Sequence, residues 1–185
     1  MSLEKSYLIS REIDINASRR IPYQDGNDMG EKKCGNLRGH RFAITAICSS
    51  ALHDPGDDQK DVFDFTFLKH AMMETIHEPC DHGLILWCED EVLPSLIPEQ
   101  DRKALLGGKD KSQWSGPPLP WSGTGTVGAL YVIPYLPVTE NLVRLWYDLL
   151  APEIIERSQN RAKLEQIKVW ETPNWWMAYP ASFGG

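Results

Sequence analysis

Three places in the sequence carry side chains that could move protons or grip a polar ligand. Cys34 lies close to Arg38, and a thiol whose pKa is lowered by a cation can act as a base or nucleophile. Asp81 precedes His82, and a carboxylate that orients an imidazole suits a proton relay. Glu171 ends an alternating segment, where its carboxylate could accept two parallel hydrogen bonds from a flat heterocycle. Each also has a plain structural interpretation: an inert thiol, a turn and a solvent-facing strand end.

Four segments that could position these residues alternate between apolar and polar side chains, the two-residue period of a half-buried strand. They cover residues 5–17, 40–52, 127–133 and 164–172. We expect the first two strands to pair in antiparallel fashion. We also expect residues 175–179 to continue in an extended conformation after Pro173-Asn174.

Two further segments place apolar residues three or four apart, the spacing of an amphipathic helix. The first runs from Asp64 to Glu78 and is closed by Pro79. The second begins near Thr139, which has the side chain of a helix N-cap, and Pro152 bends or ends it. This order of elements predicts an α+β fold with helices on one face of an antiparallel sheet.

The length of the sequence favours a single domain over residues 1–185. With 185 residues, of which 42% are hydrophobic, it can bury one core without metal or disulfide staples. Residues 89–125 combine clustered charges with a Gly- and Pro-rich stretch, and they predict an inserted surface loop. Trp114 and Trp121 lie in this loop, and a lid or binding platform is the alternative to a plain structural loop.

Charge and cysteine usage exclude several classes of protein. A net charge of −7 argues against binding to nucleic acid or to an anionic membrane surface. The first twenty residues contain no apolar signal core, and prolines interrupt the long uncharged run at residues 112–139. The four cysteines form no CxxC pair, which favours free thiols. We therefore expect a cytoplasmic protein that binds neither nucleic acid nor membrane.

Five short segments, taken together, carry a resemblance to a known family. They are Ala17-Ser18-Arg19-Arg20, Cys34-Gly35-Asn36-Leu37-Arg38-Gly39-His40, Asp81-His82, Thr139-Glu140-Asn141 and Trp170-Glu171-Thr172. Their order and spacing, from about residue 7 to about residue 180, resemble the 6-pyruvoyltetrahydropterin synthase / 6-carboxytetrahydropterin synthase family. The resemblance implies the tunnelling fold, with a four-stranded antiparallel sheet and two helices on one face. It also implies a multi-subunit β-barrel, as a homohexamer built from two trimers.

The resemblance also assigns roles to individual residues. It implies that Cys34, Asp81 and His82 are catalytic and that Glu171 anchors a pterin ring. Thr139 and Glu140 match a second pterin-contacting segment, which a neighbouring subunit supplies in the family. The implied activity is that of a carbon–oxygen lyase, with a dihydroneopterin triphosphate type of substrate, in queuosine or tetrahydrobiopterin biosynthesis.

The family's zinc site is where this sequence departs from the resemblance. Of the three zinc histidines only His40 remains, because Arg19 and Arg38 stand at the other two positions. A guanidinium has no lone pair for a metal. One alternative is a new site that joins His40 to another thiolate or imidazole, from Cys34, Cys80 or His82. The other is a pocket without zinc, in which both arginines bind a substrate oxygen, carboxylate or phosphate.

Three functions follow from these alternatives. The first is a pterin-transforming enzyme with altered or absent zinc dependence and with weaker or altered activity. The second is a non-catalytic pterin- or purine-binding protein on the same fold, which the loss of two metal ligands favours. The third is a scaffold protein without a ligand, in which Arg19 and Arg38 form only salt bridges.

Overall fold

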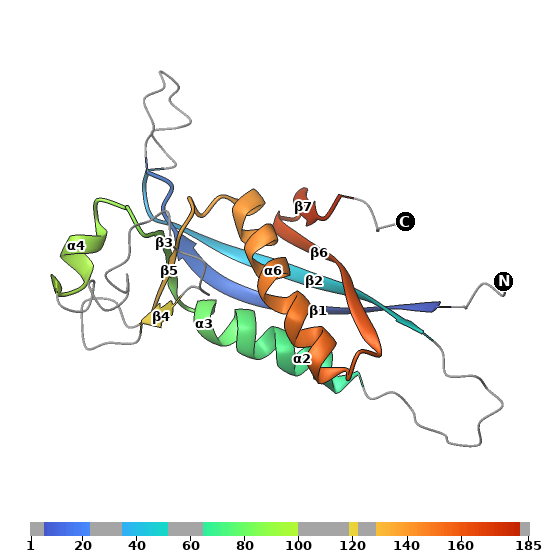
Figure 1. The fold of residues 1–185 in the computed structure, drawn as a ribbon. Coiled ribbons are helices and arrows are strands. Elements are labelled where there is room, and N and C mark those ends of the chain that lie inside the picture. The colour runs from blue at the N-terminus through green and yellow to red at the C-terminus, as the bar shows by residue number, and fades with distance from the viewer. Residues whose placement is uncertain (1–5, 23–34, 52–64, 100–118, 122–128, 182–185) are drawn as a thin grey trace, which may run out of the picture.

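A long curled sheet forms the body of the molecule in the computed structural model, which describes residues 6–22, 35–51, 65–99, 119–121 and 129–181 (Figure 1). In these residues seven strands lie in the order β4-β5-β3-β1-β2-β6-β7. Their bounds are Ser6–Arg19 for β1, Arg38–Ala51 for β2, Leu84–Trp87 for β3, Leu119–Trp121 for β4, Leu130–Ile133 for β5, Ala162–Thr172 for β6 and Trp175–Tyr179 for β7.

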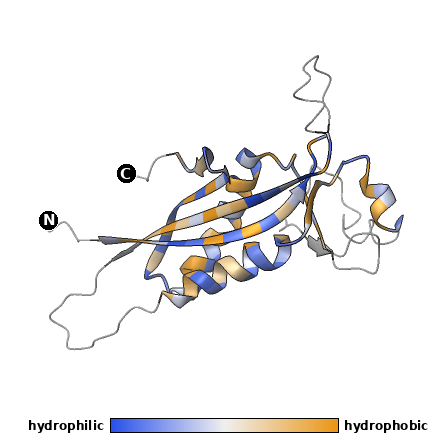
Figure 2. Ribbon diagram, turned by 180° about the vertical axis from the view of Figure 1, so that it is seen from behind, coloured by the Kyte–Doolittle hydropathy of each residue, from blue (hydrophilic) through white to orange (hydrophobic). Residues whose placement is uncertain are grey.

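The long strands follow from their alternating side chains. β1 pairs with β2 in antiparallel fashion, with Arg19 opposite Arg38, so the expected pairing of the first two strands is confirmed. β6 pairs with β2, and β7 folds back on β6 as a separate strand after Pro173-Asn174. Seen from the side away from the helices, these strands alternate between hydrophobic and hydrophilic residues (Figure 2).

The part of the sheet around β3 and β5 differs from the four-stranded antiparallel sheet that was expected. β3 pairs in parallel with both β1 and β5, so the sheet is mixed and wider than expected. The strand Leu84–Trp87 is a continuous apolar run, buried at its first three positions. A short strand buried on both faces has no alternation, which is why the sequence pattern did not identify it.

The two long helical segments cover one face of the sheet, as expected (Figure 1). The first helical segment comprises α2 (Thr66–Met72), a π-helical turn (Met73–His77) and α3 (Glu78–Cys80). The second helix, α6 (Thr139–Arg157), continues through Pro152 instead of ending there. Leu150 and Ile154, on either side of that proline, are fully buried, and their packing holds the last turns in place. No helix among the described residues is long and apolar enough to cross a membrane.

The structure describes the predicted surface loop at 89–125 only at residues 89–99 and 119–121. Each of these two stretches contains a helix or a strand. The short helix α4 (Leu93–Leu96) and β4 lie here. Leu93 and Ile97 are buried in a second hydrophobic cluster with Leu84, Leu86, Leu130 and Val132 of β3 and β5. This part of the segment is therefore packed against the sheet and is not a plain surface loop. Trp114 lies outside the described residues.

Candidate functional site

Arg19 lies at the centre of a buried polar cluster at the end of β1. Ile15 and Ala17 face the helices, and the two-residue period of the strand directs Arg19 to the same side. Its side chain is 6% exposed. Arg19 Nη1 donates to the carbonyl oxygen of Pro137 at 2.8 Å and to Thr139 Oγ1 at 3.2 Å. Arg19 Nη2 donates to Glu171 Oε1, which makes a buried ion pair between β1 and β6.

The carboxylate of Glu171 is fixed at both oxygens. While Arg19 binds Oε1, the hydroxyl of Thr139, in the first turn of α6, donates to Oε2. Burial alone would raise the pKa of Glu171, but the hydrogen bond from Thr139 and the charge of Arg19 together hold that pKa below its ordinary value. Glu171 is therefore an ionised and oriented acceptor at neutral pH.

His40 lies beside this ion pair without being part of it. Its Nε2 is 3.7 Å from Glu171 Oε1, and this buried nitrogen has no hydrogen-bond partner among the described residues. Burial, together with the positive charges of Arg19 and Arg38, lowers the pKa of His40, against the opposing effect of Glu171. The imidazole is therefore neutral at pH 7, and its contact with Glu171 is not a salt bridge.

The described donors do not fit a zinc ion. Arg19 stands where the resemblance has a histidine, and its guanidinium offers no lone pair and is bound to Glu171. Across the described ranges, no group of three or more His, Cys, Asp or Glu side chains could hold a metal ion. Burial strongly raises the pKa of Cys80, which keeps that thiol protonated and makes it a poor partner for His40.

Asp81 and His82 lie on the other side of β1, in the turn between α3 and β3. The backbone N–H of Asn16 donates to Asp81 Oδ1 at 2.8 Å, which fixes the carboxylate. Asp81 Oδ2 lies 3.6 Å from Nε2 of both His77 and His82. His82 has φ of 54° and donates its backbone N–H to the carbonyl oxygen of Asn16 at 2.7 Å. The aspartate is thus placed between two imidazoles.

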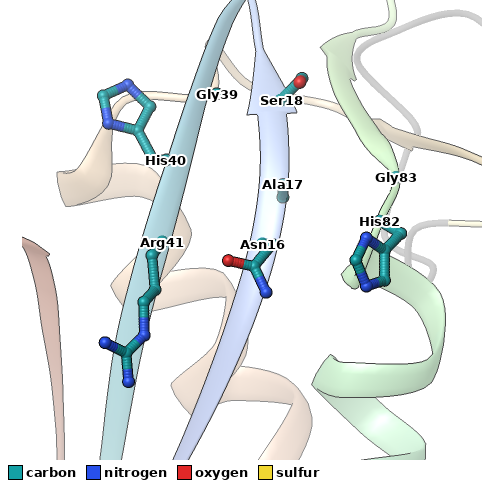
Figure 3. A pocket seen from close by; sticks show the side chains of 8 residues that line it. All are labelled: Asn16, Ala17, Ser18, Gly39, His40, Arg41, His82 and Gly83. Atoms are coloured by element: carbon teal, nitrogen blue, oxygen red, sulfur yellow. The ribbon is translucent and has the colours of Figure 1, made fainter.

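Two cavities meet at Gly39, His40 and Arg41 of β2. The first, the His82 cavity, has a volume of about 450 Å³ and is shown in Figure 3; its lining residues are Asn16, Ala17, Ser18, Gly39, His40, Arg41, His82 and Gly83. The second, the Trp170 cavity, has a volume of about 740 Å³; its lining residues are Glu12, Asp14, Gly39, His40, Arg41, Ala43, Trp170, Glu171, Thr172 and Pro173. Glu171 and His82 thus line neighbouring cavities that share three residues of β2.

The remaining candidate residues are placed as follows. Arg38 and Glu140 are exposed, at the beginnings of β2 and α6. Cys34 lies outside the described residues, so its position relative to His82 stays a prediction. Thr139 and Glu171 meet within one subunit, whereas the resemblance assigns the Thr139 segment to a neighbouring subunit.

The expectation that Thr139 caps the second helix was wrong. The N-cap of α6 is Val138, without a side-chain hydrogen bond, because the hydroxyl of Thr139 is directed to Glu171. The binding of a substrate anion by Arg19 stays a prediction; in the structure its hydrogen bonds go to Pro137, Thr139 and Glu171 of the protein itself. Both side chains hold the carboxylate in place.

Sequence reasoning missed a second ion pair beside the site. Arg20 follows Arg19 and reaches Asp90, whose side chain is fully buried, and also Glu91 at 2.6 Å. Arg20 Nε donates to the carbonyl oxygen of Gly35 at 2.8 Å, which ties the end of β1 to the residues before β2. Strand alternation could have indicated that consecutive arginines point to opposite sides, but no local pattern reveals a partner seventy residues away.

Comparison with known sequences gives two matches across nearly the whole length. A model of the family described as 6-pyruvoyl tetrahydropterin synthase matches residues 8–182. The 6-carboxy-5,6,7,8-tetrahydropterin synthase of Haemophilus influenzae is 23% identical over 173 residues, which cover 94% of this chain and 98% of that protein.

Solved structures show the same fold at low sequence identity. An uncharacterized protein of Wolinella succinogenes, WS1659, has a TM-score of 0.65 at 19% identity, and the match covers 94% of this chain and 97% of that protein. The 6-pyruvoyl tetrahydropterin synthase of Caenorhabditis elegans has a TM-score of 0.54 at 17% identity, and the match covers 98% of this chain and 100% of that protein. The expected α+β class and tunnelling fold are confirmed.

Proposed function

Because this chain belongs to the 6-pyruvoyl tetrahydropterin synthase family, we propose that it binds a pterin at Glu171 and transforms the side chain of that pterin. The substrate is of the dihydroneopterin triphosphate type, and the reaction is that of a carbon–oxygen lyase. One observation carries the proposal: an ionised, immobilised carboxylate lines a cavity of about 740 Å³ next to Trp170.

Glu171 can serve a ligand even though both of its oxygens have protein partners. A carboxylate offers about four lone-pair positions, and Arg19 and Thr139 each supply one hydrogen bond, on different oxygens. The other positions can accept the ring N–H and exocyclic amine of a pterin as two parallel bonds. Arg19 then orients the acceptor.

Proton transfer is assigned to Cys34 with Asp81 and His82. In the proposed reaction a carbon atom in the side chain of the pterin loses its proton to Cys34; the electron pair left behind forms a C=C bond, and the neighbouring C–O bond breaks to release triphosphate. The N–H of Asn16 holds Asp81, whose carboxylate lies next to the imidazole of His82 and orients it. The imidazole then exchanges protons with the side chain of the substrate. The position of His82 supports this role, because it lines a cavity that adjoins the one at Glu171.

We propose that turnover does not depend on zinc. The support is the chemistry of the donor set, in which Arg19 is committed to Glu171 and the imidazole of His40 has no second ligand nearby among the described residues. Developing charge on a substrate oxygen then has only hydrogen bonds and fixed positive charge to stabilise it. Slower turnover than with a metal is the expected consequence.

The test is binding of a pterin and turnover of dihydroneopterin triphosphate, measured by calorimetry and by product analysis. Glu171→Gln should weaken pterin binding about tenfold or more, because a charged acceptor becomes a neutral amide. Glu165→Gln is the matched control, since that glutamate is on the same strand, 12% exposed, and bound to Ser49. Equal affinity in both variants would overturn the assignment of Glu171.

The second candidate is a pterin- or purine-binding protein without turnover. Arg19 in place of a metal-binding side chain favours it. Turnover that disappears in Cys34→Ala removes this candidate, while tight binding without turnover at any zinc concentration supports it. Absence of any heterocycle binding leaves the scaffold function.

The assembly proposed with this function is a homohexamer, a dimer of trimers whose sheets join into a barrel. β7 supports it, because this strand ends the described sheet and carries the exposed Trp175 and Trp176. Native mass spectrometry measures the subunit number directly. We place the protein in the cytoplasm, in agreement with the free thiols of Cys48, Cys80 and Cys88.

A further inference from the structure

The two cavities that meet on β2 differ in charge. The residues that line the Trp170 cavity include three acidic ones, Glu12, Asp14 and Glu171, and one arginine, Arg41. The eight residues that line the His82 cavity include Arg41 and two histidines but no acidic side chain. A ligand that fills both cavities would therefore meet acidic residues at one end only, with Arg41 at the junction and the imidazole of His82 at the other end.

Arg41 lies where the cavities join and can change partner easily. Its guanidinium donates to Asp14 Oδ2 at 2.8 Å, and its side chain is 71% exposed. An ion pair this exposed contributes little to stability, so exchange of Asp14 for a ligand anion is inexpensive. Arg41 extends along β2, and Asn16 of β1 lies between it and His82 (Figure 3).

His82 forms the facing wall and is held there against its backbone preference. A residue other than glycine with φ of 54° lies in the sparsely populated left-handed region. The hydrogen bond from His82 N–H to Asn16 and the anchored carboxylate of Asp81 keep it in that conformation. The imidazole, 82% exposed, can therefore donate to a ligand that Arg41 contacts from the other side.

Building on the proposed function, we infer that the His82 cavity is a subsite for the anionic side chain of a pterin, and that Arg41 recognises its carboxylate or phosphate. Arg41 thereby sets specificity for charged over neutral pterins. The volume of about 450 Å³ is enough for a substituent of several atoms.

The experiment compares three pterins by isothermal titration calorimetry: 6-hydroxymethylpterin, pterin-6-carboxylate and neopterin triphosphate. Arg41→Gln should weaken binding of the two charged ligands about tenfold, because one charge-assisted contact is lost, and should change the neutral ligand less than about twofold. Arg144→Gln is the control, since Arg144 is 68% exposed and pairs with Asp148 at 3.8 Å on α6. If Arg41→Gln weakens binding of neopterin triphosphate more than binding of pterin-6-carboxylate, the site is assigned to phosphate. The opposite result assigns it to carboxylate.

Asp14→Asn provides a test of opposite sign. Removal of the internal partner of Arg41 should tighten binding of the charged ligands and leave 6-hydroxymethylpterin unchanged. If Arg41→Gln weakens neutral and charged ligands equally, or none of them, the subsite is overturned.

Inorganic tripolyphosphate separates this inference from the proposed function. It lacks a ring, so its binding should depend on Arg41 and not on Glu171. If no pterin binds but tripolyphosphate binds and is lost in Arg41→Gln, the pterin function fails and the anion subsite stands. If pterins bind through Glu171 but no ligand responds to Arg41→Gln, the subsite fails and the function stands.

Discussion

The two ends of the proposed ligand site are built in opposite ways. At one end Arg19 and Glu171 are 6% and 13% exposed, and their hydrogen bonds go to protein partners. At the other end the side chains of Arg41 and His82 are 71% and 82% exposed, and few contacts restrain them. Buried charges require fixed partners, so the first end is a rigid acceptor, whereas the second can rearrange around a ligand.

This difference separates stability from recognition. A substitution at the buried end should disturb both, because Arg19 and Thr139 hold Glu171 and also join β1, α6 and β6. A substitution at the exposed end should alter recognition alone. Substitutions at Arg19, Thr139 and Arg38 test that separation, and the largest effect is expected at Arg19.

Arg19→Met should lower the free energy of unfolding by about 3 kcal/mol, because it leaves the buried carboxylate of Glu171 without its cation. Urea denaturation at pH 7 measures this effect. Arg41→Met, the matched change at the exposed end, should leave the denaturation midpoint unchanged. Arg19→Lys should recover only part of the loss, since an ammonium lacks the guanidinium fork. Equal midpoints for Arg19→Met and Arg41→Met would contradict the comparison.

Thr139→Val should lower the free energy of unfolding by about 1 kcal/mol, because Glu171 Oε2 loses a hydroxyl donor while the side-chain volume is kept. Thr139→Ser, which retains the hydroxyl, should be closer to the wild type. The measurement is again urea denaturation. A valine variant as stable as the serine variant would show that this hydroxyl does not stabilise the carboxylate.

The smallest effect concerns His40, whose pKa lies below its ordinary value of about 6.5 because of burial and the nearby arginines. Because the folded protein binds this proton more weakly than the unfolded one, His40 makes the protein less stable as the pH falls below about 6.5. An NMR titration of the imidazole should show His40 neutral at pH 6.5, and Arg38→Gln should raise its pKa. Half protonation at or above about pH 6.5 in the wild type would refute this explanation.

Much of the fold followed from local patterns. Alternation identified the strands that became β1, β2 and β6, because each has one buried and one open face. It failed for Leu84–Trp87, where both faces are covered and the apolar run is continuous. The helix does not end at Pro152, one of the two outcomes expected there, since tertiary packing on both sides of the proline outweighs its local preference.

The site was predicted less well, because its contacts link residues far apart in the sequence. The resemblance identified Arg19, Thr139 and Glu171 as important, but it did not reveal that they bind one another. Arg19 and Arg38 were treated as equivalent cations. Strand geometry instead buries Arg19 among the core residues and leaves Arg38 exposed. Which side chains become partners depends on which strand ends lie together in the fold. Local patterns in one sequence do not reveal this.

The left-handed backbone at position 82 has a consequence for the stability of its turn. A turn that served architecture alone would be relaxed by glycine, which adopts φ of 54° without steric penalty. The histidine therefore makes the turn less stable than glycine would, while it places an imidazole at this point. Glycine at this position would remove that steric penalty together with the imidazole.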